Sequence, residues 1–481
     1  MPPPFTGRDR ELAFLSDQLR QVRRTGHGVL LSVRGRRRIG KSRLLEEFLR
    51  REGVGSVFFV ATRQQPGDEL AEFVNLVVRA PGVDERARER LEEARPRTWA
   101  SALDLASQGA SKRRPLVVVI DELPYLAADY RTVEATLQAA WDRDLQARPV
   151  MLVLIGSDVG MMEALTSHDR PLFGRARELV VPPLDPAAVG RLAGLGPAAA
   201  LDAYLVIGGF PQLASTWSPG EDMWAYLAAS LDDPTAPLIV NAERSLRAEF
   251  PAGGRAQDVL MAIGTGERAF SAIRTRASVN EQTLTVTLGA LQEKRVVERR
   301  LPLAGGGPGG GPRYVVADPY LRFWLRFVSP NLELVERGRG EYVLERIRAG
   351  WEAYRGQAIE PVVRAAIERV LPDERFGDAR FVGGYWTRDG RVEVDLTGTA
   401  HPESARNTQV AFVGSIKWAS QPFGREAFAA LVAHRQGVPG AGPETLLVGV
   451  SRGGYETPGL DMALGPADIM AVRGEDERRS R

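Results

Sequence analysis

Short runs of consecutive apolar residues mark the first 185 residues of the chain. They occupy residues 28–33, 56–62, 116–120, 149–155 and 176–181, and most are rich in Val, Leu and Ile. Between them lie segments with apolar residues at helical spacing, such as residues 42–52. Apolar runs without polar alternation are typical of strands buried on both faces, and strands that alternate with helices form parallel sheets. The pattern therefore predicts an α/β core with five parallel strands.

The pattern changes after residue 185. Residues 186–245 are predicted to be helical, and residues 246–335 contain three helical segments followed by two strand-like runs, 295–301 and 313–318. This is the layout of a winged helix, with the Gly/Pro-rich stretch 302–312 as the tip of the wing rather than a domain linker. Residues 336–475 combine helices with strand-like runs, which predicts a second, small α/β domain. The predicted domains are thus 1–185, 186–245, 246–335 and 336–475.

The composition narrows the class of protein. With 481 residues, of which 44% are hydrophobic, the chain can fill several domains. A net charge of only +2 does not attract the chain as a whole to nucleic acid or acidic lipid, so binding to either requires a local patch of basic residues. The chain has no cysteine, its four histidines are not at metal-ligand spacing, and no apolar run reaches the ~18–20 residues of a membrane span. We therefore expect a cytoplasmic protein with no membrane partner.

A glycine-rich loop follows the first apolar run. Its pattern is G-x-x-x-x-G-K-S, between a predicted strand and a predicted helix. In such a loop, backbone N–H groups surround nucleotide phosphates, the lysine reaches the β- and γ-phosphates, and the serine hydroxyl ligates Mg²⁺. Only four of the 63 basic residues are lysine, which indicates that the loop lysine stands where an ammonium group is required. The predicted nucleotide-binding residues are Gly35, Arg36, Arg37, Arg38, Ile39, Gly40, Lys41, Ser42 and Arg43, with the three arginine side chains pointing away from the nucleotide.

Polar residues follow two other predicted strands. Asp121 and Glu122 come directly after run 116–120, and Ser157 follows run 149–155. Because ligands bind at the carboxyl ends of strands in open α/β sheets, we expect these side chains to lie near the glycine-rich loop. Asp121 would hold Mg²⁺ together with Ser42, Glu122 would polarise the attacking water, and Ser157 would lie between the loop and the acidic pair. The Asp-Glu pair alone also fits a helix N-cap with an acidic first turn.

Arg175 precedes the last apolar run and is a further catalytic candidate. It is expected either to sense the γ-phosphate or to act as an arginine finger toward a neighbouring subunit of a homo-oligomer. An exposed arginine on a charged turn is the alternative.

Six motifs follow one another as in a known family. They are FTGRDREL, GRRRIGKS, IDELPYL, LIGSDVGMME, PLFGRARE and YLVIGGFPQ, and together they resemble the archaeal-type P-loop ATPases, relatives of the AAA+ and STAND ATPases. The resemblance implies ATP as the nucleotide, a helical lid at 186–245, Pro211 near the adenine, and Gly7-Arg8 near the base end of the nucleotide. From the residues alone, the segment Gly208–Pro211 is only a turn that breaks a helix.

The stretch YVVADPYLRFWLRFV (314–328) and the C-terminal third resemble family members whose tail is a divergent PD-(D/E)xK nuclease-like, restriction-endonuclease-like domain. In that site a helix acid, a strand Asp and a following (D/E)-x-K bind a divalent metal. Ser415 stands where a carboxylate belongs, and a hydroxyl is a poor Mg²⁺ ligand, so we expect no appreciable nuclease activity unless Glu393, Gln421 or Glu426 substitutes. Asp395 and Lys417 are then expected to pair with each other or to form a phosphate-binding patch. The matched positions are Glu360, Asp395, Ser415 and Lys417.

The predicted winged helix leaves the partner open. In a DNA-binding interpretation the third helix presents Asn280, Gln282, Thr283 and Thr285 to the groove, while Arg274, Arg276, Arg299 and Arg300 reach phosphates. Few cationic side chains lie on that helix, however, and the winged helices of ATPases also contact proteins. The sequence thus predicts an AAA+-like ATPase whose nucleotide state controls a winged helix and a degenerate nuclease-like domain on double-stranded DNA. The alternatives are a STAND-like switch that binds protein partners without DNA, and an ATP-gated nuclease.

Overall fold

The computed structural model describes residues 5–80, 82–130, 132–165, 167–168, 170–250, 255–304, 310–402 and 409–471. The chain divides into two compact units, Met1–Leu184 and Asp185–Arg481, and this division lies next to the predicted boundary at residue 185. The finer boundaries at 245 and 335 lie inside the second unit and stay predictions. None of the helices in the described part of the chain is both long and apolar enough to cross a membrane.

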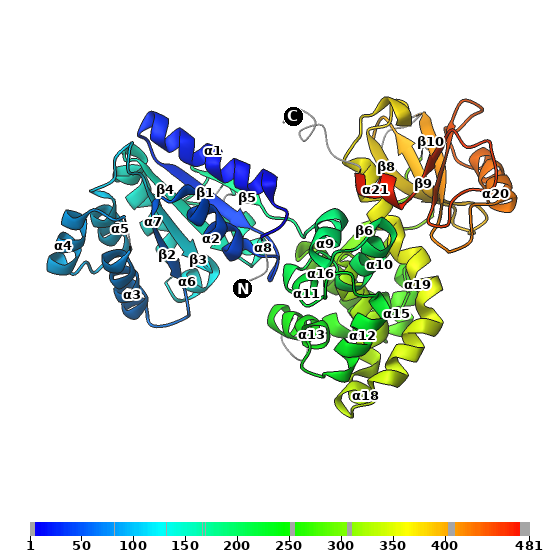
Figure 1. Cartoon of the computed structure of the whole chain (residues 1–481), viewed down its shortest axis with the longest axis horizontal. Coiled ribbons are helices and arrows are strands. Elements are labelled where there is room, and N and C mark those ends of the chain that lie inside the picture. Colours follow the sequence, from blue (N-terminus) through cyan, green and yellow to red (C-terminus); the bar gives the residue numbers. More distant parts are fainter. Residues whose placement is uncertain are drawn as a thin grey trace. The chain divides into compact units, whose positions relative to one another are not determined.

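The N-terminal unit is built around one five-stranded sheet with helices on its faces (Figure 1). The strand order is β2-β3-β4-β1-β5 and every neighbouring pair is parallel, which confirms the predicted α/β core. The strands are β1 (Val29–Arg34), β2 (Gly55–Val60), β3 (Leu116–Asp121), β4 (Val150–Gly156) and β5 (Ala176–Val180). The helices are α1 (Asp9–Thr25), α2 (Lys41–Glu52), α3 (Pro66–Arg79), α4 (Glu85–Ala94), α5 (Trp99–Ser107), α6 (Leu123–Asp129), α7 (Val133–Arg143) and α8 (Val159–Leu165).

The apolar runs form strands because both faces of the sheet are covered. All residues of β3 and β4 are buried, as expected for central strands between two helical layers. On one side Phe59 of β2, Phe73 of α3 and Trp99 of α5 meet with ring centroids 5.0 to 6.0 Å apart. Because β1, β3 and β4 are parallel, their carboxyl ends lie at one edge of the sheet, where the glycine-rich loop begins.

The C-terminal unit opens with five helices in the predicted helical segment. Proline stands at the first turn of four of them, where its missing N–H removes no helical hydrogen bond. The helices are α9 (Pro186–Ala193), α10 (Pro197–Ile207), α11 (Pro211–Ser215), α12 (Met223–Asp232) and α13 (Pro237–Glu249).

Three helices and a two-stranded antiparallel sheet follow, in the order expected for a winged helix. Asn280 caps the third helix, because its side chain accepts a hydrogen bond from the backbone N–H of Thr283 at 2.8 Å. Residues 305–309 of the predicted wing tip, five of its eleven residues, lie outside the described residues. The elements are α14 (Ala256–Gly264), α15 (Phe270–Arg276), α16 (Glu281–Glu293), β6 (Val297–Arg300) and β7 (Arg313–Val316).

The rest of the unit is a mixed sheet with helices, reached through a 29-residue helix, α19. The sheet order is β12-β11-β10-β9-β8, antiparallel from β8 to β10 and parallel from β10 to β12. This combination of a mixed sheet and helices agrees with the small α/β domain predicted for the end of the chain. The elements are α17 (Pro319–Phe323), α18 (Leu332–Glu336), α19 (Gly340–Glu368), β8 (Phe381–Trp386), β9 (Glu393–Thr399), β10 (Val410–Lys417), α20 (Arg425–Gln436), β11 (Leu446–Ser451), β12 (Met462–Leu464) and α21 (Pro466–Ala471).

Candidate functional site

The glycine-rich loop joins β1 to α2, and two glycines determine its path. A Cβ atom on Gly35 would lie 2.4 Å from the carbonyl oxygen of Val181 and 2.5 Å from Ile39, so no side chain fits there. Gly40 has a φ of 87°, and Arg38 has a φ of 65°, both in the left-handed region. Such turns aim successive backbone N–H groups toward one concave face, and the N-terminus of α2 adds partial positive charge. The loop therefore has the backbone of an anion-binding site.

Lys41 begins α2 and reaches back across the loop. Its Nζ donates hydrogen bonds to the carbonyl oxygens of Gly35 at 2.8 Å and Arg36 at 2.9 Å. Burial lowers the pKa of the Lys41 ammonium to about 8, although the nearby Glu122 and Asp121 carboxylates raise it. The ammonium group is thus held inside the loop, where a bound phosphate would meet it.

Asp121 ends β3 beside the N-terminus of α2. Its Oδ2 accepts a hydrogen bond from Ser42 Oγ at 2.5 Å, and its Oδ1 accepts one from the backbone N–H of Glu122 at 2.8 Å. A hydroxyl and a buried carboxylate are both hard oxygen donors, and Mg²⁺ in nucleotide sites takes few protein ligands besides phosphate oxygens and water. Ser42 and Asp121 therefore fit the ion that the motif implies.

Glu122 follows in a strained conformation that faces Ser157. Its φ of 54° is unusual for a residue with a side chain, and such strain gathers at functional sites. The Ser157 hydroxyl, just after β4, donates to the Glu122 carboxylate, with Oγ 2.8 Å from Oε2 and 3.1 Å from Oε1. The carboxyl ends of β3 and β4 thus bring together a carboxylate and a hydroxyl that orients it. Glu122 does occupy the N-cap position of α6, as the alternative expected, but its side chain makes no capping hydrogen bond and instead contacts Ser157.

Two arginines contact the loop in ways that the motif did not specify. Arg8, at the base of α1, donates from Nη2 to the carbonyl oxygen of Ile39 at 3.0 Å and lies 3.3 Å from Glu11. Arg37 donates from Nη2 to the hydroxyl of Tyr125 at 2.8 Å, and Arg63 lies 4.3 Å above the ring of Tyr125. Tyr125 lies in the quoted motif IDELPYL, but its role as an anchor for Arg37 was missed. These contacts connect the outer side of the loop to the start of α1 and to α6.

The other loop residues differ in how far they are buried, and their predicted contacts with nucleotide stay predictions. Arg36 is half-buried, Arg38 is exposed and Ile39 is buried. Arg43 lies in the first turn of α2, where its exposed side chain is 3.3 Å from Glu46.

Arg175 lies at the opposite edge of the sheet. It precedes β5, and β5 runs parallel to β1 with Ala176 beside Leu30 and Val180 beside Arg34. Five residues of strand, or ~16 Å, therefore separate Arg175 from the loop edge. The guanidinium forms a bidentate ion pair with Asp142 at 2.7 and 2.8 Å. The expectation that Arg175 senses the γ-phosphate of a nucleotide bound to its own chain is wrong, because Arg175 lies before β5 and the loop lies at the end where β5 finishes. The predicted role of Arg175 toward a neighbouring subunit stays a prediction.

Pro211 belongs to the C-terminal unit, where it begins α11 directly after Phe210. Its predicted position near adenine stays a prediction, since each unit is described by itself.

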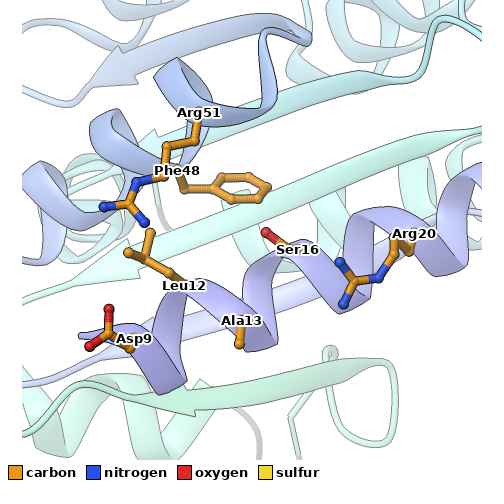
Figure 2. A pocket seen from close by; sticks show the side chains of 7 residues that line it. All are labelled: Asp9, Leu12, Ala13, Ser16, Arg20, Phe48 and Arg51. Atoms are coloured by element: carbon orange, nitrogen blue, oxygen red, sulfur yellow. The ribbon is translucent and has the colours of Figure 1, made fainter. Parts of the chain in front are cut away.

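The N-terminal unit also has a surface hollow of about 270 Å³ between α1 and α2. Figure 2 shows the side chains that line it, with Arg51 and Phe48 on α2 facing α1. The hollow lies along the second half of α2, two turns or more from Lys41. Its arginines are paired, Arg20 with Asp17 and Arg51 with Glu47, so the hollow carries little net charge. The lining residues are Asp9, Leu12, Ala13, Ser16, Arg20, Phe48 and Arg51.

In the C-terminal unit, three of the four nuclease-like positions lie near one another. Asp395 Oδ2 accepts hydrogen bonds from the backbone N–H of Ile416 at 2.7 Å and from Ser415 Oγ at 3.2 Å. Arg364 donates from Nη2 to Glu360 at 3.0 Å and from Nε to the carbonyl oxygen of Asp395 at 2.9 Å. A guanidinium thus connects the helix acid to the strand that carries Asp395.

Lys417 is exposed, and among the described residues no ion pair joins it to Asp395, so the expected Asp395–Lys417 pair is not formed. The carboxylate of Asp395 is instead occupied by Ser415 and a backbone N–H. Glu393, a possible substitute ligand, is paired with Arg313 at 2.6 and 3.1 Å. No three His, Asp or Glu side chains cluster as metal ligands within the described ranges.

Together, the loop, the Ser42–Asp121 contact and the Glu122–Ser157 contact at the carboxyl edge of a parallel sheet define a P-loop ATPase. Residues 5–193 match the family of ATPase domains found predominantly in Archaea. The N-terminal part of the chain is therefore an ATPase domain of this archaeal type, as the motifs indicated. Residues 324–427 match a family of archaeal and bacterial proteins of unknown function. The nuclease-like character of the tail stays a prediction.

Several proteins resemble the chain over most of its length. An uncharacterized protein of Methanocaldococcus jannaschii is 24% identical over 422 residues, which are 86% of this chain and 87% of that protein. Among solved structures, a Walker-type ATPase of Pyrococcus abyssi is 21% identical, with a TM-score of 0.48, and the match covers 67% of this chain and 96% of that one. The ORC2 protein of Aeropyrum pernix in its ADPNP and ADP complexes is 15% identical, with a TM-score of 0.44, covering 72% and 96%.

Proposed function

We propose that the chain hydrolyses ATP with Mg²⁺ at the edge of the N-terminal sheet. The observation that carries the proposal is the arrangement of Lys41 inside the loop, Ser42 on Asp121, and Ser157 on Glu122. Lys41 and the loop N–H groups bind the phosphates, while Ser42 and Asp121 would hold Mg²⁺, which neutralises phosphate charge when bound. Water attacks the γ-phosphorus, the bond to the bridging oxygen breaks, and the water proton passes to the Glu122 carboxylate. Ser157 orients that carboxylate.

We further propose that nucleotide state in the N-terminal unit controls the C-terminal unit. Support comes from the division of the chain into one unit that contains the phosphate loop and another that contains the winged-helix elements and the mixed sheet. The test is phosphate release by the full chain, measured with and without a DNA duplex. Stimulation by the duplex supports control on DNA, whereas equal rates oppose it.

We propose double-stranded DNA as the partner of the winged-helix elements. On α16, Gln282 and Thr285 are exposed, and Arg274 and Arg276 are exposed on α15. Arg299 also faces solvent. Arg300, which was expected to reach phosphates, is instead half-buried and pairs with Glu298 at 2.7 Å. The surface formed by α15, α16 and β6 therefore has three exposed cations, of which Arg274 also lies 3.9 Å from Glu281, and this suits a modest, salt-sensitive contact.

The double variant Arg274→Gln/Arg276→Gln is expected to reduce the salt dependence of duplex binding. Each lost phosphate contact removes about 0.9 from the slope of log affinity against log salt, so the slope should shrink by about two. Fluorescence anisotropy with a labelled duplex at several salt concentrations measures this slope. The matched control is Arg425→Gln/Arg435→Gln on α20, which should keep the wild-type slope. An unchanged slope in the test variant places DNA elsewhere.

The second candidate is a STAND-like switch that binds protein and not DNA. The observation that favours it is Val286, whose 68% exposure puts an apolar side chain in the middle of the exposed face of α16. The same anisotropy experiment separates the two, because this candidate requires that the wild-type chain bind no duplex even at low salt.

We propose that the tail no longer cleaves DNA. A nuclease site of the PD-(D/E)xK type needs a metal between its carboxylates, whereas here Arg364 bridges Glu360 and the Asp395 strand, and Ser415 replaces a carboxylate. We expect no cleavage of plasmid DNA by the wild type with Mg²⁺ or Mn²⁺, measured on agarose gels, and none by Asp395→Ala. Cleavage by the wild type that disappears in Asp395→Ala would instead support the ATP-gated nuclease.

A further inference from the structure

A cavity of about 240 Å³ lies inside the C-terminal unit, between the winged-helix elements, the middle of α19 and the end of β8. Tyr314 and Trp386 form aromatic parts of its wall, and Pro361 and Gln357 of α19 form another part. Six arginines line the cavity, and Glu360 is the one acid among the described residues that do so. The arginines are Arg268, Arg300, Arg313, Arg322, Arg326 and Arg364.

Half of these arginines are neutralised by carboxylates. Each pair is close, with N–O distances of 2.6 to 3.0 Å. Burial raises the pKa of the Glu360 carboxyl, which weakens the negative charge in the cavity. The pairs are Arg300 with Glu298, Arg313 with Glu393, and Arg364 with Glu360.

The other three guanidinium groups have neutral partners. Arg268 donates to the side-chain oxygen of Gln357 at 2.9 Å, and Arg326 donates to a backbone carbonyl. Arg322 donates to two carbonyl oxygens, of Val316 at 2.6 Å and of Ala358 at 3.3 Å. Within the described part of the chain, none of the three forms a salt bridge, and burial lowers the pKa of Arg322. Three guanidinium charges are thus gathered without a paired carboxylate. Arg326 is exposed and solvated, but Arg268 and Arg322 are partly buried, and the cost of burying their charges falls if an anion binds.

We propose that this cavity binds a phosphate-bearing anion with two or more negative charges. The planar guanidinium fork matches phosphate oxygens, and six arginines with no lysine favour such bidentate recognition. Three uncompensated charges favour a diphosphate or a terminal phosphomonoester over a single carboxylate. The volume is below the roughly 300–1,000 Å³ of pockets for drug-sized ligands, so the cavity takes the phosphate group and not a whole nucleotide. The group comes either from a free small molecule or from the phosphorylated end of a nucleic acid strand.

The test uses the full chain carrying Lys41→Ala, so that the phosphate loop does not contribute. Sodium pyrophosphate is titrated calorimetrically, and Arg268→Gln/Arg326→Gln is added in the same background. We expect binding that the added variant weakens at least about tenfold, since each lost charged contact costs roughly a factor of ten or more. The matched control is Arg425→Gln/Arg435→Gln, because Arg435 also donates only to carbonyl groups among its described contacts. The control should bind pyrophosphate as its parent does.

Arg326→Gln alone keeps the test valid if the double variant unfolds, because Arg326 is exposed and its loss should not disturb the fold. A single-stranded oligonucleotide with and without a 5′-phosphate distinguishes the sources of the anion. Tighter binding of the phosphorylated strand, lost in the arginine variants, supports a strand end; equal binding of both strands, with pyrophosphate retained, supports a free small molecule. The proposal is overturned if the Lys41→Ala chain does not bind pyrophosphate, or if the arginine variants bind it as tightly as their parent.

Discussion

Lys41→Ala is expected to lower the affinity for ATP by at least about a hundredfold. Lys41 is the cation inside the loop, and it would exchange the carbonyl oxygens of Gly35 and Arg36 for the β- and γ-phosphates. Each charged hydrogen bond contributes about 1.5–3 kcal/mol, and every 1.4 kcal/mol is a factor of ten in affinity, so two lost contacts give this magnitude. Isothermal titration with ATP and Mg²⁺ measures the effect.

Lys112→Ala is the matched control, because it removes an exposed lysine from the same unit and should leave ATP affinity unchanged. The pH dependence gives a second measurement. Because the pKa of Lys41 is about 8, its amine is already protonated below that pH before nucleotide binds. Above a pH of about 8, the amine must first take up a proton before it can pair with phosphate. Wild-type affinity should therefore fall as pH rises through about 8, while Lys41→Ala shows no such fall. Equal affinity of wild type and Lys41→Ala would remove the nucleotide site from this loop.

The predicted sheet came from a strong physical signal. Strands covered on both faces need uninterrupted apolar residues, so β3 and β4 are visible as runs without any knowledge of the fold. The same rule placed Asp121 and Ser157 at the loop edge, because each follows its strand. Strand direction also places Arg175 at the other edge, since that residue precedes β5. The strand direction was readable from the sequence, and the position of Arg175 before its strand already argued against a contact with phosphates bound to its own chain.

Contacts between distant segments could not be predicted. Arg8 meets Ile39, and Arg37 meets Tyr125, only because α1 and α6 pack beside the loop. The basic cavity is lined by residues between 263 and 386, and each arginine alone looks like an ordinary surface charge. Arg364 was the exception, because Glu360 and Arg364 are four residues apart on a helix and so lie on one face. That spacing already indicated an ion pair where the nuclease-like pattern required a metal ligand.

Glu122→Gln is expected to preserve ATP binding and to slow hydrolysis by about a hundredfold to ten-thousandfold, the usual contribution of a general base. Glutamine keeps the shape of the side chain and can still accept the hydrogen bond from Ser157, but it cannot take a proton from water. The strained backbone at Glu122 is unchanged by this substitution, so a loss of turnover reports on the carboxylate and not on folding. Phosphate release under single-turnover conditions measures the chemical step, and titration with ATP measures binding.

The matched control is Glu46→Gln on α2, which removes an exposed carboxylate paired with Arg43 and should turn over as the wild type does. Ser157 gives an internal check on the assignment. If Ser157 acts by orienting the Glu122 carboxylate, Ser157→Ala slows the wild type but slows Glu122→Gln little further, because the group it positions is already lost. Wild-type turnover in Glu122→Gln would show that another residue acts as the base. The hydrogen bond between Ser157 and Glu122 would then serve only to hold the carboxyl ends of β3 and β4 together.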